Sequence, residues 1–422
     1  MKYIVILGDG MADEPIVELG NKTPLQFAHK PYIDKIAALG RCGMLQTIPK
    51  GFEPGSEIAN LSVLGYDVSK VYEGRGSLEA ASMGVPIKQG EMAMRCNLIC
   101  IENKKLKNHS AGHISTEEAA ELIQFLNREL SSEFVKFYSG VSYRHLITVK
   151  GGNKQIKCTP PHNVPDTPWK DVLIKAETNE ARETADFLNN LIIRSQKLLE
   201  NHPINIARKQ AGKDPANSIW LWSPGYMPQM QTLLETYDLR NGVVISAVDL
   251  IKGIGIYAGL QSIEIEGATG LADTNYEGKA MAAIEALKNN DFVYLHIEAS
   301  DEAGHEGNVQ LKVKTIEYLD DRIVRPIWER LQTWNEPVTI AILPDHPTPC
   351  EKRTHTTSPV PFIIYRPGHS PDEITSYDEK SAQKGYYGLM KAEDFMFTLV
   401  DMNIIKEMYH KMKLKYKEFR GK

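Results

Sequence analysis

The sequence predicts an α/β protein whose core is a doubly wound, mostly parallel sheet and which carries a smaller inserted α+β domain. Three continuous apolar runs, at residues 3–7, 292–297 and 338–343, have the pattern of strands that are buried on both faces of a parallel sheet. They lie near the two ends of the chain, whereas the middle combines amphipathic helical patterns with shorter strand patterns. We therefore expect a discontinuous core domain of residues 1–71 and 243–422 and an inserted domain of residues 72–242.

An acidic residue follows each of the three predicted strands. Asp9 stands in Gly8-Asp9-Gly10 after the first strand, Asp301 follows the second, and Asp345 follows the third after a proline. The carboxyl ends of parallel strands meet at one edge of an open α/β sheet, and ligands bind at that edge. We therefore expect these three carboxylates to lie close together.

The middle of the chain predicts a different kind of structure. Amphipathic periodicity indicates helices at Ser115–Leu130 and Glu177–Asn201, and an apolar run indicates a strand at Val141–Val149. Two Pro-rich segments, Thr159–His162 and Thr167-Pro168, predict turns between these elements.

The composition is that of an ordinary globular protein. The chain has 422 residues, of which 42% are apolar and 24% charged, and at about 150 residues per domain this length predicts two domains and allows three. A net charge of −5 argues against nucleic acid or an anionic membrane surface as a partner. No apolar run reaches the roughly 18 residues that a membrane span needs, and the run after Met1 is too short for a signal peptide.

The cysteines predict neither a disulfide framework nor a thiolate metal site. There are five of them, scattered along the chain, and Cys96 and Cys100 have no second pair with which to complete four ligands. We therefore expect reduced thiols and a cytoplasmic location.

Acids and histidines cluster in a pattern that suits metal binding. Asp301 and His305 are four residues apart, so on a helix they face the same way, while Asp345-His346 and then His355 follow the third strand. Together with Asp9 they supply oxygen and imidazole ligands without thiolate, which suits manganese or zinc, and iron or magnesium less well. Six such ligands suffice for two metal ions about 4 Å apart, as in phosphoryl-transfer sites.

Ser56 is the candidate nucleophile. It follows Pro54-Gly55 and opens a predicted helix, whose free N–H groups would stabilise a phosphate carried on its hydroxyl. A serine in this position is also a common N-cap, and that alternative remains open. Nearby, the Gly-flanked Arg75 offers a fork for a carboxylate or a phosphate.

These residues resemble the alkaline phosphatase superfamily, and within it the cofactor-independent phosphoglycerate mutases of archaeal type. The resemblance spans essentially the whole chain. The matching stretches are Gly8–Met11, Pro54–Ser56, Leu64–Asp67, Gly74–Gly76, Arg95–Asn97, Lys252–Gly255, Gly267–Gly270, Thr274–Glu277, Asp301–Gly307, Asp345-His346 and His355.

The resemblance implies an alkaline-phosphatase-like core and a role for each of these residues. One metal would take Asp301, His305 and His355, and the other would take Asp9, Ser56, Asp345 and His346. Ser56 would be phosphorylated transiently while 2-phosphoglycerate and 3-phosphoglycerate interconvert, and the inserted domain would close over the substrate and exclude water. Arg75, Arg95 and Arg144 are implied clamps on phosphate and carboxylate, and Lys252 is implied as the lysine near the metals.

Several stretches depart from the mutase pattern. His113 replaces the arginine that usually follows Ala-Gly, and an imidazole is a poorer phosphate fork than a guanidinium. The other departing stretches are Gly140–His145, Thr159–His162, Ile219–Trp222 and Ile245–Asp249. They are closer to a sister branch proposed to act as a homoserine kinase, in which Asp249 would suit an ammonium-bearing substrate.

Two further functions are compatible with the same residues. A phosphatase or phosphodiesterase would result if water reached the phosphoserine, and a binding module would result if the fold had lost its activity. The latter is disfavoured because all seven ligand positions are intact. In each enzymatic alternative the partner is a small phosphorylated or hydroxyl-bearing metabolite, and the oligomeric state is left open.

Overall fold

Two compact units make up the chain. The computed structural model describes residues 1–402. The core unit comprises Met1–Tyr72 and the described segment from Met230 onward, and the inserted unit comprises Glu73–Gln229. Residues 230–242, which we expected in the inserted domain, therefore belong to the core unit. The Leu233 amide donates to the Ala258 carbonyl (2.9 Å), so this segment satisfies its backbone within the core.

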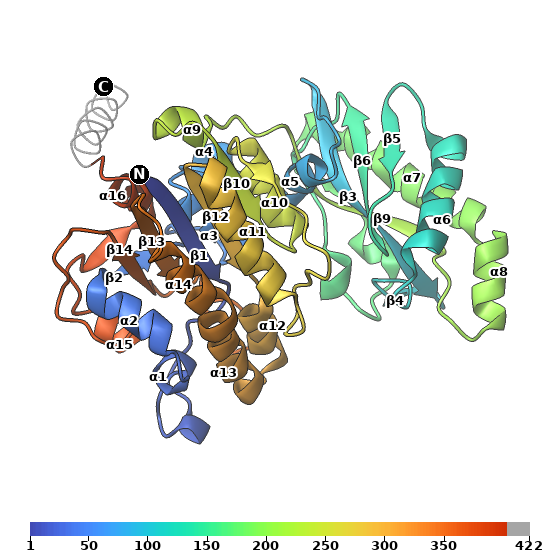
Figure 1. Cartoon of the computed structure of the whole chain (residues 1–422). Coiled ribbons are helices and arrows are strands. Elements are labelled where there is room, and N and C mark those ends of the chain that lie inside the picture. Colours follow the sequence, from blue (N-terminus) through green and yellow to red (C-terminus); the bar gives the residue numbers. More distant parts are fainter. Residues whose placement is uncertain (403–422) are drawn as a thin grey trace. The chain divides into compact units, whose positions relative to one another are not determined.

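The core sheet has the predicted doubly wound, mostly parallel architecture (Figure 1). Helices cover both of its faces, with α11 and α14 on one face and α3 and α10 on the other (Figure 1). Within the described residues it contains eight strands, in the order β11 (Gln261–Ser262), β10 (Gly242–Ile245), β12 (Phe292–Ile297), β1 (Lys2–Gly8), β13 (Val338–Leu343), β14 (Val360–Tyr365), β2 (Arg41–Gln46) and β15 (Leu389–Lys391).

The three strands predicted from apolar runs are β1, β12 and β13, and they are neighbours. β1 lies between the other two and is parallel to both, with Gly8 paired to Ile297 and Leu7 paired to Leu343. Every residue of β12 and β13 is buried, as the continuous apolar runs predict. The register brings the carboxyl ends of these strands to the same edge.

The helices of the core unit follow its strands in alternation. Ala280, Ala283 and Leu287 of α11 belong to the same buried hydrophobic cluster as Ile4 and Ile6 of β1. The helices are α1 (Pro24–Phe27), α2 (Pro31–Leu39), α3 (Ser56–Val63), α4 (Val68–Val71), α9 (Leu233–Thr236), α10 (Asp249–Tyr257), α11 (Tyr276–Asn289), α12 (Ala299–Glu306), α13 (Val309–Tyr318), the π-helix η5 (Leu319–Val324), α14 (Arg325–Leu331), α15 (Glu379–Ala382) and α16 (Phe395–Leu399).

The inserted unit is an antiparallel α+β structure with a hydrophobic core of its own. Its sheet runs in the order β4 (Lys105–Asn108), β3 (Glu91–Glu102), β6 (Arg144–Lys150) and β5 (Val135–Tyr138), and β9 (Ser218–Gly225) also pairs with β3. A separate pair of short strands is β7 (Ile156–Lys157) and β8 (Lys175–Ala176). Its helices are α5 (Arg75–Ser82), α6 (Thr116–Leu130), α7 (Arg182–Leu199) and α8 (Pro203–Gln210).

The elements predicted in the middle of the chain are found with shifted ends. The first helix is α6, and the Ser115 hydroxyl caps it by accepting from the Glu118 amide (3.2 Å). The predicted helix at 177–201 was too long, because the short 3₁₀ turn η4 (Asn179–Ala181) precedes α7. The predicted strand at 141–149 began too early, because the Arg144 amide donates to the Val141 carbonyl (3.0 Å) and closes a turn there.

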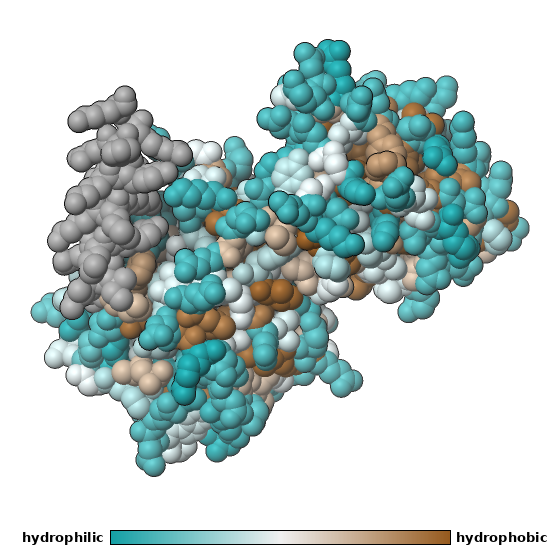
Figure 2. All heavy atoms as spheres, turned by 90° about the horizontal axis from the view of Figure 1, so that it is seen from above, coloured by the Kyte–Doolittle hydropathy of each residue, from teal (hydrophilic) through white to brown (hydrophobic). Residues whose placement is uncertain are grey.

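None of the helices in the described part of the chain is both long and apolar enough to cross a bilayer. The face in Figure 2 carries mostly hydrophilic side chains, with hydrophobic ones in small groups between them. All five cysteines are free, and four of them are buried.

Candidate metal centre and active site

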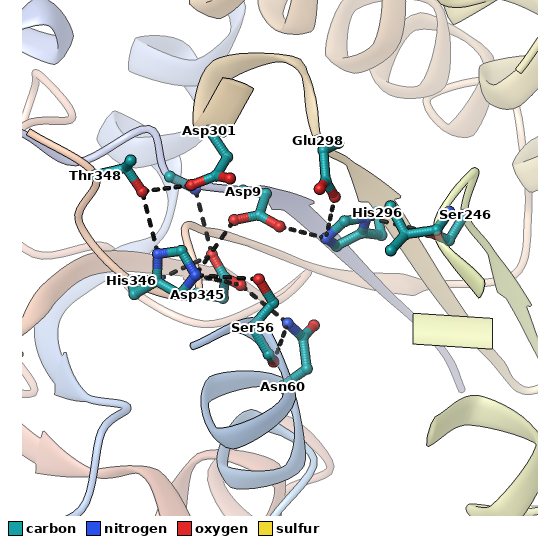
Figure 3. Close-up of polar contacts among 12 residues, drawn as sticks. Asp9, Ser56, Asn60, Ser246, His296, Glu298, Asp301, Asp345, His346 and Thr348 are labelled. Atoms are coloured by element: carbon teal, nitrogen blue, oxygen red, sulfur yellow. Dashed lines mark hydrogen bonds and ion pairs between the residues drawn. The ribbon is translucent and has the colours of Figure 1, made fainter. Parts of the chain in front are cut away.

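Three carboxylates meet at the carboxyl edge of the core sheet (Figure 3). Asp9 follows β1, Asp345 follows β13, and Asp301 lies in the first turn of α12, which follows β12. Asp9 and Asp345 are fully buried and Asp301 is nearly so. The Gly10 amide donates to Asp345 Oδ1 (3.3 Å) and so joins the turn after β1 to the turn after β13. The parallel pairing of β1 with β12 and β13 therefore brings together the three carboxylates that follow these strands.

One group of possible ligands surrounds Asp301. His305, one helical turn later in α12, places its Nε2 3.3 Å from Asp301 Oδ2, and His355 Nε2 lies 3.4 Å from Asp301 Oδ1. The two imidazole Nε2 atoms are themselves 2.8 Å apart. Because at most one proton fits between them, at least one lone pair points into the space they share with the carboxylate. A cation bound there would satisfy all three side chains.

A second group surrounds His346. Its Nε2 lies 3.4 Å from Asp345 Oδ2, 3.6 Å from Asp9 Oδ1 and 3.2 Å from the Ser56 hydroxyl oxygen. Its Nδ1 lies 3.3 Å from the hydroxyl of Thr348. Possible ligand atoms of His346, Asp301 and His355 also lie close enough together to bind one metal ion, so the two groups are adjacent.

Ser56 is positioned by the helix that it opens. It is the first residue of α3, with Gly55 as the N-cap residue, so the serine is not the cap. The Asn60 amide donates to the Ser56 carbonyl (2.8 Å) and to Asp345 Oδ2 (2.9 Å), and its oxygen accepts from the Tyr294 hydroxyl (2.6 Å). Asn60 therefore ties the start of α3 to the carboxylate of Asp345. The Ser56 hydroxyl lies at a helix amino end, where free N–H groups favour an anion.

The structure adds His296 and Glu298, which were not predicted as site residues. His296 lies near the carboxyl end of β12, and the other residues of this strand are apolar or aromatic. Its Nε2 lies 3.0 Å from Asp9 Oδ2 and 3.8 Å from Glu298 Oε2. Its Nδ1 lies 3.2 Å from the Ser246 hydroxyl (Figure 3). A polar residue inside an otherwise apolar strand was the available signal, because a fully buried histidine needs partners on both ring nitrogens.

The carboxylates of the cluster repel one another. Burial, together with the charges of Asp345, Asp301 and Glu298, raises the pKa of Asp9. Burial, together with the charge of Asp301, raises the pKa of Glu298 to about 8. Both shifts have the direction expected when several acids share a dry site without counter-charge.

The imidazoles of His305 and His355 lower the pKa of the carboxylate that they contact. Burial alone would raise the pKa of Asp301, but hydrogen bonds from His305 and His355 outweigh it and lower that pKa. In turn, the hydrogen bond to Asp301 raises the pKa of His305 to about 9. The Asp301 side of the cluster is thus partly neutralised by histidine, whereas the Asp9 side is not.

The cluster fits divalent metal ions. The Oδ1 atom of Asp9 and the Oε2 atom of Glu298 are buried and have no hydrogen-bond partner among the described residues. An unpaired buried carboxylate oxygen is costly, and a cation removes that cost. The donor atoms are carboxylate oxygens, imidazole nitrogens and a serine oxygen, a set that binds hard and borderline divalent ions.

Comparison with known proteins identifies the family. A family model described as 2,3-bisphosphoglycerate-independent phosphoglycerate mutase matches residues 37–205. The chain is 52% identical over 404 residues to the protein of that name from Methanosarcina acetivorans, covering 95% of this chain and 100% of the relative. It is 46% identical over 400 residues to a Geobacter sulfurreducens protein named as a probable enzyme of the same kind, covering 94% of this chain and 98% of the relative. The chain belongs to the 2,3-bisphosphoglycerate-independent phosphoglycerate mutases.

Solved structures agree with this membership. A Pyrococcus horikoshii protein matches with a TM-score of 0.80 and 30% identity, covering 95% of this chain and 96% of that one. The cofactor-independent phosphoglycerate mutase of Thermoplasma acidophilum matches with a TM-score of 0.67 and 26% identity, covering 95% of this chain and 100% of that one. Both relatives carry the mutase name, so the homoserine kinase alternative is not favoured. Membership in this mutase family implies dependence on divalent metal ions.

Lys252, expected near the metals, and Asp249, expected to suit an ammonium-bearing substrate, both lie in α10. Lys252 donates to Glu264 Oε2 (2.7 Å) and lies 3.8 Å from Asp249 Oδ1, one helical turn earlier in α10. Lys252 and Asp249 therefore partly neutralise each other. A different lysine, Lys279 of α11, is fully buried, donates to the Thr269 carbonyl at 3.4 Å and interacts electrostatically with Glu298. Burial lowers the pKa of Lys279 to about 8.

The implied substrate arginines of the mutase lie in the inserted unit. Arg95 Nη1 donates to Glu79 Oε1 (3.0 Å), and Arg75 Nε lies 3.9 Å from the same oxygen. Arg144 is exposed, and its charge acts with that of Arg75 to lower the pKa of the buried Arg95, although burial is the larger cause. His113 is exposed and has a left-handed backbone (φ 50°). The structure thus groups the three arginines.

Proposed function

We propose that this chain interconverts 2-phosphoglycerate and 3-phosphoglycerate by transferring phosphate through Ser56. The proposal rests on the position of the Ser56 hydroxyl at the start of α3, 3.2 Å from His346 Nε2, which itself lies 3.4 Å from Asp345 Oδ2. A hydroxyl placed among these ligands and at a helix amino end is arranged to become a nucleophile and then to hold a phosphate.

We assign two divalent ions, manganese or zinc with magnesium also possible, to the two ligand groups. Asp301, His305 and His355 would hold one ion, and Asp9, Ser56, Asp345 and His346 would hold the other. When bound, such ions neutralise phosphate charge and favour the ionised form of a serine hydroxyl.

The phosphate transfer through Ser56 has two steps. Ser56 Oγ attacks the phosphorus of the substrate, and the bond between phosphorus and the glycerate oxygen breaks, which leaves phosphoserine and free glycerate. The neighbouring glycerate hydroxyl then attacks the phosphoserine and releases Ser56. The first glycerate oxygen gains a proton and the second loses one, so the isomerisation takes up no net proton.

We further propose that Arg75, Arg95 and Arg144 bind the anionic groups of the substrate, because guanidinium forks suit carboxylate and phosphate. His113 is an exposed residue of the same unit, and we propose it as a further substrate contact. We keep Lys252 as the proposed lysine near the metal ligands and Asp249 as a proposed substrate residue; Lys252 pairs with Glu264 and lies 3.8 Å from Asp249 Oδ1. The free cysteines and the central metabolic substrate favour the cytoplasm as the compartment.

Replacing the nucleophile tests the proposal. The full-length chain supplied with Mn²⁺ should form 2-phosphoglycerate from 3-phosphoglycerate without a nucleotide, and Ser56→Ala should reduce that rate by at least about a thousandfold. Ser62→Ala is the matched control, because Ser62 is a buried serine of the same helix. Intact-mass measurement should detect a phosphorylated form that Ser56→Ala lacks. Undiminished transfer in Ser56→Ala would reject the phosphoserine route.

A further inference from the structure

One threonine side chain of the core unit joins the two groups of possible metal ligands. Thr348, two residues after His346, donates its hydroxyl hydrogen to Asp301 Oδ1, and the same hydroxyl oxygen lies 3.3 Å from His346 Nδ1 (Figure 3). Asp301 belongs to the first ligand group and His346 to the second. Thr348 is fully buried, so its hydroxyl is shielded from bulk solvent. A single hydroxyl therefore contacts one member of each group.

The backbone of Thr348 is held from both sides. Its amide donates to the Ala12 carbonyl (3.2 Å), and its carbonyl accepts from the Lys312 ammonium (2.8 Å). Ala12 lies in the turn after β1, and Lys312 lies in α13. Because both of its backbone polar groups are bonded, Thr348 has a fixed place relative to the turns that carry the ligands.

Helix α12 fixes the orientation of the Thr348 side chain. Gly304 of α12 faces this residue, and a Cβ on Gly304 would lie 2.3 Å from the Thr348 carbonyl oxygen and 2.9 Å from its methyl carbon. A larger residue at 304 would therefore push away the helix that carries Asp301. The Thr348 methyl group lies against Gly304, and a β-branched side chain has few alternative rotamers, so the hydroxyl stays directed toward Asp301 and His346.

The chemistry of the three groups sets the direction of the two hydrogen bonds. A hydroxyl has one hydrogen, and an ionised carboxylate can only accept. Asp301 must be ionised to bind a metal ion, so the Thr348 hydrogen goes to Asp301. The hydroxyl oxygen is then an acceptor for His346, which places the imidazole proton on Nδ1. In a neutral imidazole this leaves the lone pair on Nε2.

That lone pair lies where the second ligand group converges. Nε2 of His346 lies 3.2 Å from the Ser56 hydroxyl oxygen, 3.4 Å from Asp345 Oδ2 and 3.6 Å from Asp9 Oδ1. A proton on Nε2 would occupy the space that a cation needs among these oxygens. The tautomer of His346 therefore decides whether the second group can bind a metal ion, and the partner of Nδ1 decides the tautomer.

We propose that Thr348 is a positioning residue that selects the Nδ1–H tautomer of His346 and so leaves Nε2 free to bind a metal ion. This inference rests on the proposed function, which assigns an ion to the second ligand group. The hydroxyl of Thr348, rather than its bulk, is the active feature. Thr348→Val keeps the branched shape and removes the hydroxyl, whereas Thr348→Ser keeps the hydroxyl and removes the methyl group.

Nuclear magnetic resonance of the metal-free, full-length chain tests the tautomer. In protein with nitrogen-labelled histidine, couplings between the ring nitrogens and the carbon-bound ring hydrogens distinguish a protonated nitrogen from an unprotonated one. The His346→Gln variant identifies the signals of His346 by their loss. We expect a protonated Nδ1 in the unsubstituted chain and in Thr348→Ser. Thr348→Val should lose this single tautomer, because Nδ1 then has no acceptor from residue 348.

The affinity for Mn²⁺ measures the consequence. We expect Thr348→Val to reduce this affinity by about 10–100-fold, the usual effect of losing a partner that orients a metal ligand, and Thr348→Ser to restore most of it. Electron paramagnetic resonance of free Mn²⁺ gives these values without relying on activity. Thr339→Val is the matched control, because Thr339 is a fully buried threonine of β13 whose hydroxyl lies 3.9 Å from Met1 Sδ. Circular dichroism checks that each variant folds.

The outcomes separate this inference from the proposed function. A proton on Nε2 of His346 in the unsubstituted, metal-free chain would overturn the inference, whatever the variants do. An unchanged Mn²⁺ affinity in Thr348→Val, or equal losses in Thr348→Val and Thr348→Ser, would overturn it as well. A tautomer and a metal affinity that depend on the hydroxyl, found in a chain without mutase turnover, would instead reject the proposed function and leave the role of Thr348 in place.

Discussion

The two oxygens of Asp9 differ in a way that explains the role of His296. Oδ2 lies 3.0 Å from His296 Nε2, whereas Oδ1 is buried without a hydrogen-bond partner among the described residues. The Val248 amide donates to the Ser246 hydroxyl oxygen (3.0 Å), so the Ser246 proton is available for His296 Nδ1. His296 then carries its own proton on Nε2 and donates it to Asp9 Oδ2. This chain of hydrogen bonds holds Asp9 with Oδ1 free to bind a metal.

Removing this donor should weaken metal binding. We expect His296→Leu to reduce the affinity for Mn²⁺ by about 10–100-fold, the usual effect of losing a partner that orients a metal ligand. Electron paramagnetic resonance of free Mn²⁺ measures this directly, without relying on activity. Ser246→Ala, which leaves the imidazole in place but frees its tautomer, should have a smaller effect in the same direction. An unchanged affinity in His296→Leu would show that Asp9 needs no support from this side.

At the scale of elements, a side chain of α13 binds both the turn after β1 and the turn after β13, which carry metal ligands. Lys312 of α13 is fully buried, and its ammonium donates to the Ala12 carbonyl (3.2 Å), to Asp13 Oδ2 (2.8 Å) and to the Thr348 carbonyl (2.8 Å). Ala12 and Asp13 lie in the turn after β1, and Thr348 lies in the turn after β13. One side chain thus uses its three hydrogens to hold both turns together.

Lys312→Met should therefore destabilise the core unit strongly. It leaves the buried carboxylate of Asp13 without its positively charged partner, and breaking a buried ion pair from one side costs about 3–5 kcal/mol. Urea unfolding monitored by circular dichroism measures this loss. Lys314→Met, at an exposed lysine of the same helix, should change the free energy of unfolding by less than about 0.5 kcal/mol. If the two variants lost similar free energies of unfolding, Lys312 would not hold the two turns together.

At the scale of the whole molecule, each unit has its own hydrophobic core. The main core of the core unit contains Trp328, whereas that of the inserted unit contains Trp220 and Trp222. All seven assigned metal ligands belong to the core unit. Metal binding should therefore stabilise one unit directly and the other not at all, because a ligand stabilises the state that binds it.

Removing metal should separate the two units in a melting experiment. A ligand at 100 times its Kd contributes about 2.7 kcal/mol, so chelation with EDTA should lower the Tm of the core unit by about 5–10 °C. The transition of the inserted unit should stay in place. Differential scanning calorimetry resolves the two transitions, and the Trp328→Phe variant identifies by fluorescence which one belongs to the core unit. An equal shift of both transitions would mean that the units unfold as one.

Much of the core sheet could be predicted, because its central strands have apolar patterns that are recognisable within each segment. The continuous apolar runs that became β1, β12 and β13 are visible without any partner strand, since burial on both faces requires apolar residues at every position. The acids beyond those runs then had to meet at one edge, because parallel strands end together. The spacing of Asp301 and His305 likewise predicted a shared helical face, and α12 provides it.

Tertiary structure alone decided the features that depend on neighbours distant in the sequence. His296 contacts Asp9 only because β12 pairs with β1 in one register, and no local pattern distinguishes that histidine from another buried polar residue. Lys252 pairs with Glu264 and Lys279 lies near Glu298, and no local pattern predicts either contact. The rings of His109, His162 and Trp222 come from segments up to more than a hundred residues apart, and only the packed inserted unit brings them together. Hydrophobic periodicity is a property of a segment, but a site is a property of the strand order and register that join segments.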